Sequence, residues 1–201
     1  MRPAHRASRL AARRDAVARA PAPGGHVVRA AAHDASARRI DLAWAALEAV
    51  PDPEIPVVSI RELGILRDIR ETDGGALEVV ITPTYNGCPA MEQIEEDVRA
   101  ALAGHGIEAH VVSRLAPAWT TDWITPEARE KLRAFGIAPP GSSAQDNVVR
   151  FARRGARHEA VACPRCGSSD TTETSHFGST ACKALFKCLA CLEPFDHFKP
   201  Y

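Results

Sequence analysis

The sequence contains no apolar run approaching the roughly 20 residues that a membrane span needs, and its first residues include no apolar stretch typical of secretory signals. We therefore expect a cytoplasmic chain without a membrane partner. The formal net charge is zero, so the overall charge does not favour a nucleic acid as partner. The sequence also lacks a phosphate-binding glycine loop, a nucleophile elbow and a His-Glu metal motif, which argues against a stand-alone enzyme.

Cysteine is scarce, at six residues in 201, yet four of the six form two Cys-x-x-Cys pairs near the end of the chain. The four are Cys163, Cys166, Cys188 and Cys191. Two thiolates three residues apart can hold one metal ion from a tight turn, and a second such turn completes a tetrahedral shell of four sulfurs. We predict a structural zinc site. Iron in the same site, free thiols, disulfides and a redox pair are the alternatives.

Composition and apolar pattern divide the chain into four parts. Residues 1–39 are rich in Arg and Ala and poor in acids, which predicts a disordered N-terminus, with an organellar transit peptide as the alternative. The remaining parts are a small α+β domain over 40–135, a linker over 136–157 and a zinc-binding module, similar to a zinc ribbon with four cysteine ligands, over 158–201.

Within the α+β domain the patterns predict a three-stranded sheet with helices. A short helix is expected from near Ile40, and a hairpin over 65–82 contains the turn signal Asp-Gly-Gly. Apolar residues at helical spacing predict a helix over 90–103, followed by a third strand over 107–115. A final helix is expected after Thr125, which suits the N-cap, with Pro126 in the first turn.

Cys88 lies in a loop that leads into the helix predicted over 90–103. Backbone N–H groups and the positive end of the helix dipole favour a thiolate at such a position. A thiolate there can bind iron or an iron–sulfur cluster, or attack an electrophile. The alternative is a small buried cysteine with a packing role.

Asp52 and Glu54 provide two carboxylates on a stretch that prolines stiffen. They are candidates for contacting a metal or orienting a partner. The alternative is a solvated turn that ends the preceding helix.

The stretch from Asp52-Pro53-Glu54 to Thr84-Tyr85-Asn86-Gly87-Cys88-Pro89 resembles the MIP18 (DUF59) family of iron–sulfur assembly factors. The run Pro117-Ala118-Trp119 fits the same family, and the resemblance covers roughly residues 40–135. It implies a small α+β fold and makes Cys88 the candidate for transient contact with iron or a cluster. Asp52 and Glu54 match the family's acidic motif.

The end of the chain makes the family resemblance more specific. The residues that do so are the two Cys-x-x-Cys pairs, Phe177 to Leu185 and Glu193-Pro194-Phe195-Asp196. Over residues 40–201 the chain is similar to the D-subunit family of bacterial phenylacetyl-CoA epoxidases, multicomponent di-iron monooxygenases of aerobic phenylacetate breakdown. The resemblance implies a non-catalytic accessory factor that helps to mature iron or iron–sulfur centres. Its partners would be epoxidase subunits, above all the ferredoxin-type reductase. A homodimer stays open.

Cys182 lies between the two cysteine pairs, and its role is left open by the sequence. The alternatives are a fifth thiol near the metal, an alternative or mobile metal ligand, and a half-buried cysteine of a hairpin. His158, His176 and His197 flank the module, but four cysteines already complete a zinc shell, so we expect them at the surface or beside the ligands.

Two other functions compete with the accessory factor. One is a structural subunit present at fixed stoichiometry in the oxygenase complex. The other is a nucleic-acid-binding zinc ribbon, which the basic cluster over 150–157 favours. The neutral to acidic remainder of the chain and the lack of a basic and aromatic stripe argue against this second alternative.

Overall fold

The computed structural model describes residues 25–141 and 161–201. Residues 36–201 form one compact unit, which carries all the candidate site residues that are described. Within the described ranges, no helix has both the length and the apolar character needed to cross a membrane. Most of the expected disordered N-terminus, most of the expected linker, the basic cluster over 150–157 and His158 lie outside the described residues.

The first helix, α1 (Gly25–Leu47), begins earlier than the sequence predicted. Its start was expected near Ile40, where the apolar pattern begins. The preceding residues are rich in Ala and Arg, which have high helix propensity, so the helix extends through a stretch that has no apolar stripe. Ala43 and Leu47 near its end are fully buried, and they anchor this last part of the helix in the core.

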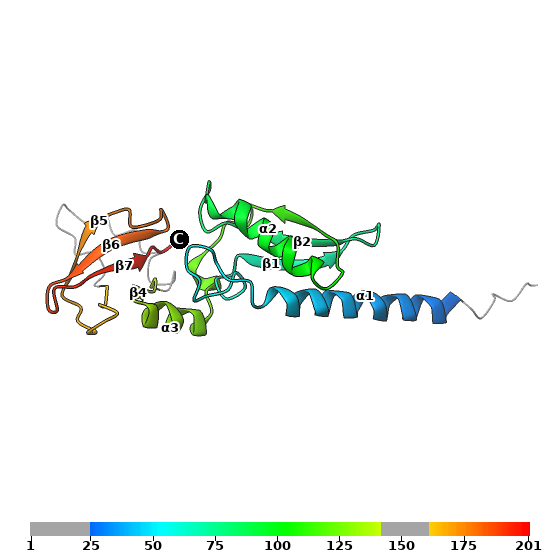
Figure 1. Ribbon diagram of the computed structural model, residues 1–201, viewed down its shortest axis with the longest axis horizontal. Coiled ribbons are helices and arrows are strands. Elements are labelled where there is room, and N and C mark those ends of the chain that lie inside the picture. Colours follow the sequence, from blue (N-terminus) through cyan, green and yellow to red (C-terminus); the bar gives the residue numbers. More distant parts are fainter. Residues whose placement is uncertain (1–24, 142–160) are drawn as a thin grey trace, which may run out of the picture. The chain divides into compact units, whose positions relative to one another are not determined.

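The first sheet contains β1 (Leu66–Glu71), β2 (Leu77–Ile81) and β3 (Ala109–Ser113), in the order β1-β2-β3. β1 and β2 form the predicted antiparallel hairpin. β3 lies parallel to β2, and a parallel neighbour requires a crossover connection, which α2 (Ala90–Ala103) supplies. This arrangement confirms the expected small α+β fold (Figure 1).

α2 packs one face against the sheet because its apolar residues recur at every fourth position. The buried residues of this face are Ala90, Ile94, Val98 and Leu102. They belong to the same core cluster as Leu77, Val79 and Ile81 of β2, so the start of α2 is held firmly in place. This anchoring fixes the position of Cys88, which lies just before the helix.

α3 (Pro126–Phe135) confirms the predicted helix start. The N–H of Ala128 donates to the Thr125 hydroxyl at 3.1 Å, and the helix ends at Gly136, whose φ of 97° is in the left-handed region. The next residues were expected to begin a linker. Instead they form a short strand, β4 (Ile137–Ala138), which pairs with the last strand of the chain.

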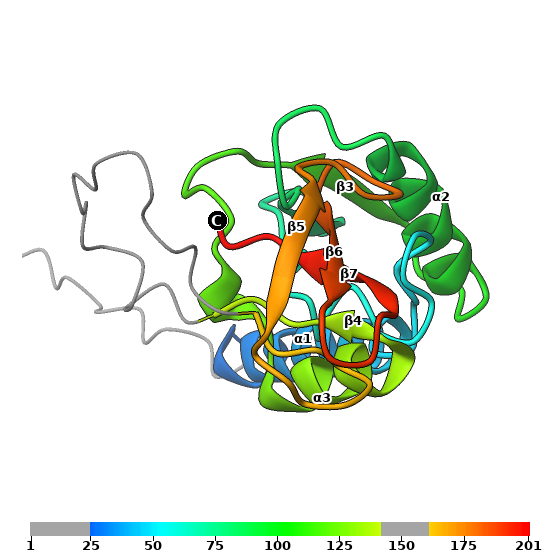
Figure 2. The ribbon, with the colours of Figure 1, turned by 90° about the vertical axis from the view of Figure 1, so that its left-hand side faces the viewer.

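The second sheet belongs to the cysteine-rich module, called the ribbon below. It contains β5 (Thr171–Ser175), β6 (Lys183–Cys188) and β7 (Pro194–Phe198), in the order β4-β7-β6-β5. β5, β6 and β7 form an antiparallel meander, and β4 adds to its edge in parallel with β7 (Figure 2). The ribbon therefore incorporates a strand that comes directly from the end of α3.

The ribbon and the α+β domain share one hydrophobic core. Cys182 and Phe198 of the ribbon are 4% and 1% exposed and belong to the same cluster as the residues under the first sheet. Trp119 connects the two parts: its indole N–H donates to the Leu63 carbonyl at 3.0 Å, and its ring lies 5.9 Å from the ring of Phe198. This packing brings ribbon residues next to the loops of the α+β domain.

Candidate functional site

The four cysteines predicted to bind metal form a compact group, called the four-cysteine cluster below. Their Sγ atoms all lie within 4.8 Å of one another. The Sγ–Sγ distance is 3.8 Å for Cys163 and Cys191, and 3.6 Å for Cys166 and Cys188. A zinc ion with Zn–S bonds of about 2.3 Å places tetrahedral sulfurs about 3.8 Å apart. The donor set therefore fits a structural metal ion with four thiolate ligands.

Two turns of similar backbone shape build the four-cysteine cluster. Each pair of cysteines is followed by a residue in the left-handed region, Gly167 with φ 76° and Leu192 with φ 67°. Among the described residues, Leu192 is the one non-glycine with positive φ, a conformation that side chains other than glycine rarely adopt. The N–H of Cys191 points to the Cys188 sulfur at 3.4 Å, and such N–H groups stabilise thiolates and orient metal-bound sulfurs.

A second group of polar side chains lines a small pocket, called the Cys88 pocket below. It lies where the loop after α1, the loop before α2, the start of β6 and the end of β7 meet. Its lining residues are Asp52, Glu54, Ile55, Leu63, Ile65, Thr84, Cys88, Met91, Cys182 and Phe198. The structure thus brings the three candidates Asp52, Glu54 and Cys88 together, although more than 30 residues separate the acidic motif from Cys88 in the sequence.

Asp52 shapes the loop that carries Glu54. Its carboxylate Oδ1 accepts hydrogen bonds from the N–H groups of Glu54 at 2.9 Å and Ile55 at 2.8 Å. The side chain is buried, and this burial raises the pKa of Asp52, while the two N–H donors act in the opposite direction. Asp52 therefore closes a tight turn that fixes the backbone beneath Glu54.

Glu54 faces the ribbon. Its Oε2 lies 3.9 Å from the sulfur of Cys182, and the Thr180 hydroxyl lies 3.0 Å from the same sulfur. Burial raises the pKa of Glu54, and the nearby Asp52 carboxylate raises it further. Burial also raises the pKa of the Cys182 thiol to about 11, with a further contribution from Glu54.

The pKa of Cys88 differs from the one that the sequence predicted. The helix N-cap is Pro89, so Cys88 stands one residue outside the helix, where the Ala90 N–H reaches its sulfur. The sequence predicted a thiolate stabilised at this position. The structure corrects this: burial raises the pKa of Cys88, and the Glu54 and Asp52 carboxylates raise it further. The helix end is too weak to overcome burial beside two acidic groups.

Tyr85 completes the surroundings of Cys88. Its hydroxyl forms a hydrogen bond with the Cys88 sulfur, and burial together with the nearby Cys88 raises the pKa of Tyr85. Tyr85 was not among the predicted site residues. The only sequence signal was its place three residues before Cys88 in the same loop.

Cys182 lies outside the four-cysteine cluster, which excludes a fifth ligand position in that cluster within the described residues. The sequence left its role open because Cys182 lies close in sequence to β6 and the second cysteine pair. No local pattern indicates that its side chain enters the core of the α+β domain. This placement follows from the packing of the ribbon.

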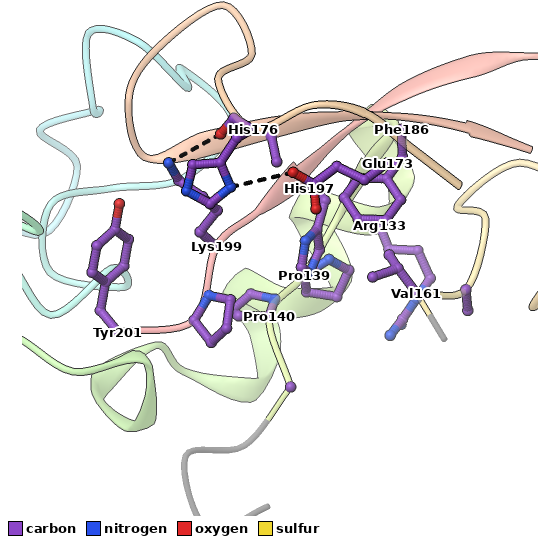
Figure 3. A pocket seen from close by; sticks show the side chains of 15 residues that line it. Arg133, Pro139, Pro140, Val161, Glu173, His176, Phe186, His197, Lys199 and Tyr201 are labelled. Carbon is purple, nitrogen blue, oxygen red and sulfur yellow. Dashed lines mark hydrogen bonds and ion pairs between the residues drawn. The ribbon is translucent and has the colours of Figure 1, made fainter. Parts of the chain in front are cut away.

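The described histidines of the ribbon do not join the four-cysteine cluster. His197 is largely buried against the ring of Phe186, whereas His176 is paired with Glu173 at 3.2 Å. His176 also borders a larger pocket of about 570 Å³, where its carbonyl accepts a hydrogen bond from Lys199 at 3.2 Å (Figure 3). This larger pocket contains no cysteine, so the thiol chemistry of the molecule is confined to the other two sites among the described residues.

Comparison with known families divides the chain in the same way, into a part with the Cys88 loop and a part with the four-cysteine cluster. Residues 41–113 match the family model of iron–sulfur cluster assembly proteins, and residues 149–199 match that of the PaaD zinc beta ribbon domain. The whole Cys88 loop lies in the first matched region, and the four-cysteine cluster lies in the second. Cys182 is in the ribbon region as well.

Individual relatives match either most of the chain or less than half of it. The chain is 48% identical, over 78% of its length and 90% of the relative's, to the Escherichia coli K12 protein named as the D subunit of 1,2-phenylacetyl-CoA epoxidase. It is 35% identical over 42% of its length to the Fe-S protein maturation auxiliary factor YitW of Bacillus subtilis, of which it covers 83%. A solved DUF59 domain from Bacillus anthracis is 28% identical, with a TM-score of 0.46, over 50% of this chain and 96% of that one.

Proposed function

The chain belongs to the family of the phenylacetyl-CoA epoxidase D subunit, and from this premise we propose that it is a non-catalytic maturation factor for the iron centres of that enzyme system. Its substrate is iron or an iron–sulfur cluster in transit, which contacts Cys88 with Asp52 and Glu54 beside it. The receiving partner is the ferredoxin-type reductase subunit. A relative that matches 42% of the chain is itself named an auxiliary factor for the maturation of Fe-S proteins.

The observation that carries this proposal is the Cys88 pocket. A thiol and two carboxylates from separate loops line one small space at the start of α2. Sulfur and oxygen donors together suit ferrous iron and similar divalent cations. Cys88 is half-buried, whereas Cys182 in the same pocket is buried, so we propose that Cys88 is the thiol that cargo reaches first.

The four-cysteine cluster has a different part in the proposal. Four sulfurs around one point form a closed shell, which is the arrangement of structural zinc sites. We assign zinc to it. Metal binding there supplies folding free energy to a module whose own hydrophobic cluster is small.

A second function, a structural subunit of fixed stoichiometry, is favoured by one surface feature. Large apolar side chains of the ribbon are exposed, namely Phe177 at 64%, Leu189 at 47% and Leu192 at 65%. Exposed apolar groups of this kind are typical of contact surfaces. Persistence of the protein with the epoxidase during purification at high salt would favour a permanent subunit, and its loss would favour a transient factor.

The test of the maturation role uses co-expression with the reductase. The substitution Cys88→Ser should leave this protein folded. It should lower the iron content and the visible absorbance of the purified reductase toward the level obtained when this protein is not co-expressed. Glu92→Gln, an exposed position in the first turn of α2, is the control and should support full cluster occupancy. Full occupancy with Cys88→Ser would remove Cys88 from the mechanism.

A further inference from the structure

Cys182 has an environment that a purely structural cysteine does not need. It is 4% exposed, yet its sulfur faces the Glu54 carboxylate at 3.9 Å and the Thr180 hydroxyl at 3.0 Å. A cysteine that only fills space behaves as a small apolar side chain and packs among apolar atoms. Here the thiol is directed at the polar side of the Cys88 pocket.

The two thiols of the pocket come from different parts of the chain but line the same small space. Cys88, Cys182 and Glu54 all border it, and Glu54 Oε2 lies 3.9 Å from the Cys182 sulfur. All three groups carry negative charge when they are deprotonated, so they repel one another in this space. A divalent cation between them would relieve the repulsion among all three groups at once.

Lys183 supplies positive charge beside these groups. Its side chain is 5% exposed, with the ammonium 3.8 Å from Asp196, and its charge lowers the pKa values of Asp52, Glu54 and Cys182. Two thiolates and the carboxylates of Asp52 and Glu54 carry four negative charges, so one divalent cation leaves two. Lys183, which also faces Asp196, offsets part of this remainder. Such compensation favours metal binding in a buried site.

We infer that Cys182 is the second thiol ligand of the cargo site, so that a divalent cation is bound by Cys88 from the α+β domain, Cys182 from the ribbon, and Glu54. Binding displaces one proton from each thiol. Cys88 and Glu54 are half-buried and close on the ion by side-chain rotation, while Cys182 stays fixed in the core. The identity of the cargo as iron rests on the proposed function, whereas the metal site itself does not.

The inference gives the ribbon a direct role in the site. Cys182 is held at the entrance to β6 by its own backbone, because the Lys199 N–H donates to the Cys182 carbonyl at 2.9 Å. A folded ribbon is therefore required to place the sulfur opposite Glu54. The four-cysteine cluster therefore affects cargo binding indirectly, because it keeps the ribbon folded and Cys182 in place.

The experiment titrates the zinc-loaded, full-length, reduced protein with Co²⁺ in the absence of oxygen. Zinc binds four thiolates more tightly than cobalt does, so the four-cysteine cluster keeps its zinc. We expect one Co²⁺ per chain, with a sulfur-to-cobalt charge-transfer band in the near ultraviolet. Cys182→Ser and Cys88→Ser should each weaken binding at least about tenfold and remove about half of the band intensity.

Three further variants make the result specific. Cys182→Ala keeps a small apolar side chain in the core and should show the same loss, with zinc content and circular dichroism of the wild type. Glu54→Gln should weaken Co²⁺ binding with little change in the charge-transfer band, because it removes an oxygen ligand. Glu92→Gln makes the same charge change at an exposed position and should leave binding unaltered.

Failure of this inference is distinguishable from failure of the maturation role. If both Cys182 variants bind Co²⁺ with wild-type affinity and band intensity while Cys88→Ser does not, Cys182 is not a ligand, and the maturation role of Cys88 is unaffected. No Co²⁺ bound by the wild type would also overturn the inference. Normal reductase maturation by Cys88→Ser, with the expected cobalt results, would instead overturn the proposed function and leave the metal site in place.

Discussion

The four-cysteine cluster and the Cys88 pocket are both rich in sulfur, but they are built in opposite ways. The four-cysteine cluster joins two short turns whose sulfurs already lie at the spacing of a tetrahedral zinc site. The Cys88 pocket joins loops from across the unit; Glu54 and Cys182, which face each other in it, are 128 positions apart in the chain. Two carboxylates, Asp52 and Glu54, line the pocket together with its thiols.

This difference suits two kinds of metal chemistry. A closed shell of four sulfurs retains its ion and contributes to folding. In the Cys88 pocket the pKa values of both thiols are raised by burial, so the metal-free pocket holds protonated thiols at neutral pH. A metal must displace these protons, which weakens net binding and favours release. Under the proposed function, the surroundings of the sulfurs distinguish a site that retains its ion from a site that releases it.

The largest expected effect comes from removing the metal of the four-cysteine cluster. Replacing Cys163→Ser, or chelation, should unfold the ribbon, because structural zinc contributes about 10–16 kcal/mol in small zinc modules at neutral pH. Zinc analysis and hydrogen exchange of β6 and β7 measure the loss. Cys182→Ser is the matched control and should keep its zinc. A ribbon that stays protected from exchange after chelation would contradict the distinction between the two sulfur sites.

The second prediction concerns the hydrophobic core that joins the ribbon to the α+β domain. Phe198 is 1% exposed and lines the Cys88 pocket, so Phe198→Ala should lower the free energy of unfolding by about 3–5 kcal/mol. Phe177→Ala, at a side chain 64% exposed, should cost less than about 0.5 kcal/mol. Urea unfolding measured by tryptophan fluorescence gives both values. Equal midpoints for the two variants would mean that the ribbon does not share the core of the α+β domain.

The smallest predicted effect is on the titration of Cys88. Because its pKa is raised, the thiol stays protonated through neutral pH, and its alkylation by iodoacetamide in the metal-free pocket should keep accelerating beyond about pH 9, above the ordinary thiol pKa. A thiol with a lowered pKa would react at a constant rate above neutral pH.

Glu54→Gln sharpens this test. It removes a negative charge that raises the pKa of Cys88, so alkylation near neutral pH should become several-fold faster than in the wild type, whereas Glu92→Gln should not change it. Mass spectrometry of the peptide that contains Cys88 gives the rates. A wild-type alkylation rate that does not change with pH above neutrality would mean that Cys88 is a thiolate at neutral pH, as the sequence predicted.

Local patterns predicted much of the fold. The hairpin, α2 and the capped start of α3 follow from alternation, helical spacing and the side-chain chemistry of Thr125, and all three are confirmed. The start of α1 was misplaced because Ala and Arg extend a helix without leaving an apolar stripe. β4 was missed because a strand of two residues has no periodicity and forms only when β7 lies beside it.

By itself, the sequence determined each of the two pairs in the four-cysteine cluster, because cysteines three residues apart are held together by chain connectivity in any tight turn. It also placed Cys88 directly before a helix. Only the tertiary structure decided that Cys182 faces Glu54 and that the Cys88 thiol has a raised rather than a lowered pKa. Both depend on which distant residues are buried together, and that is set by the packing of Phe198 and Trp119 between the ribbon and the α+β domain rather than by any local pattern.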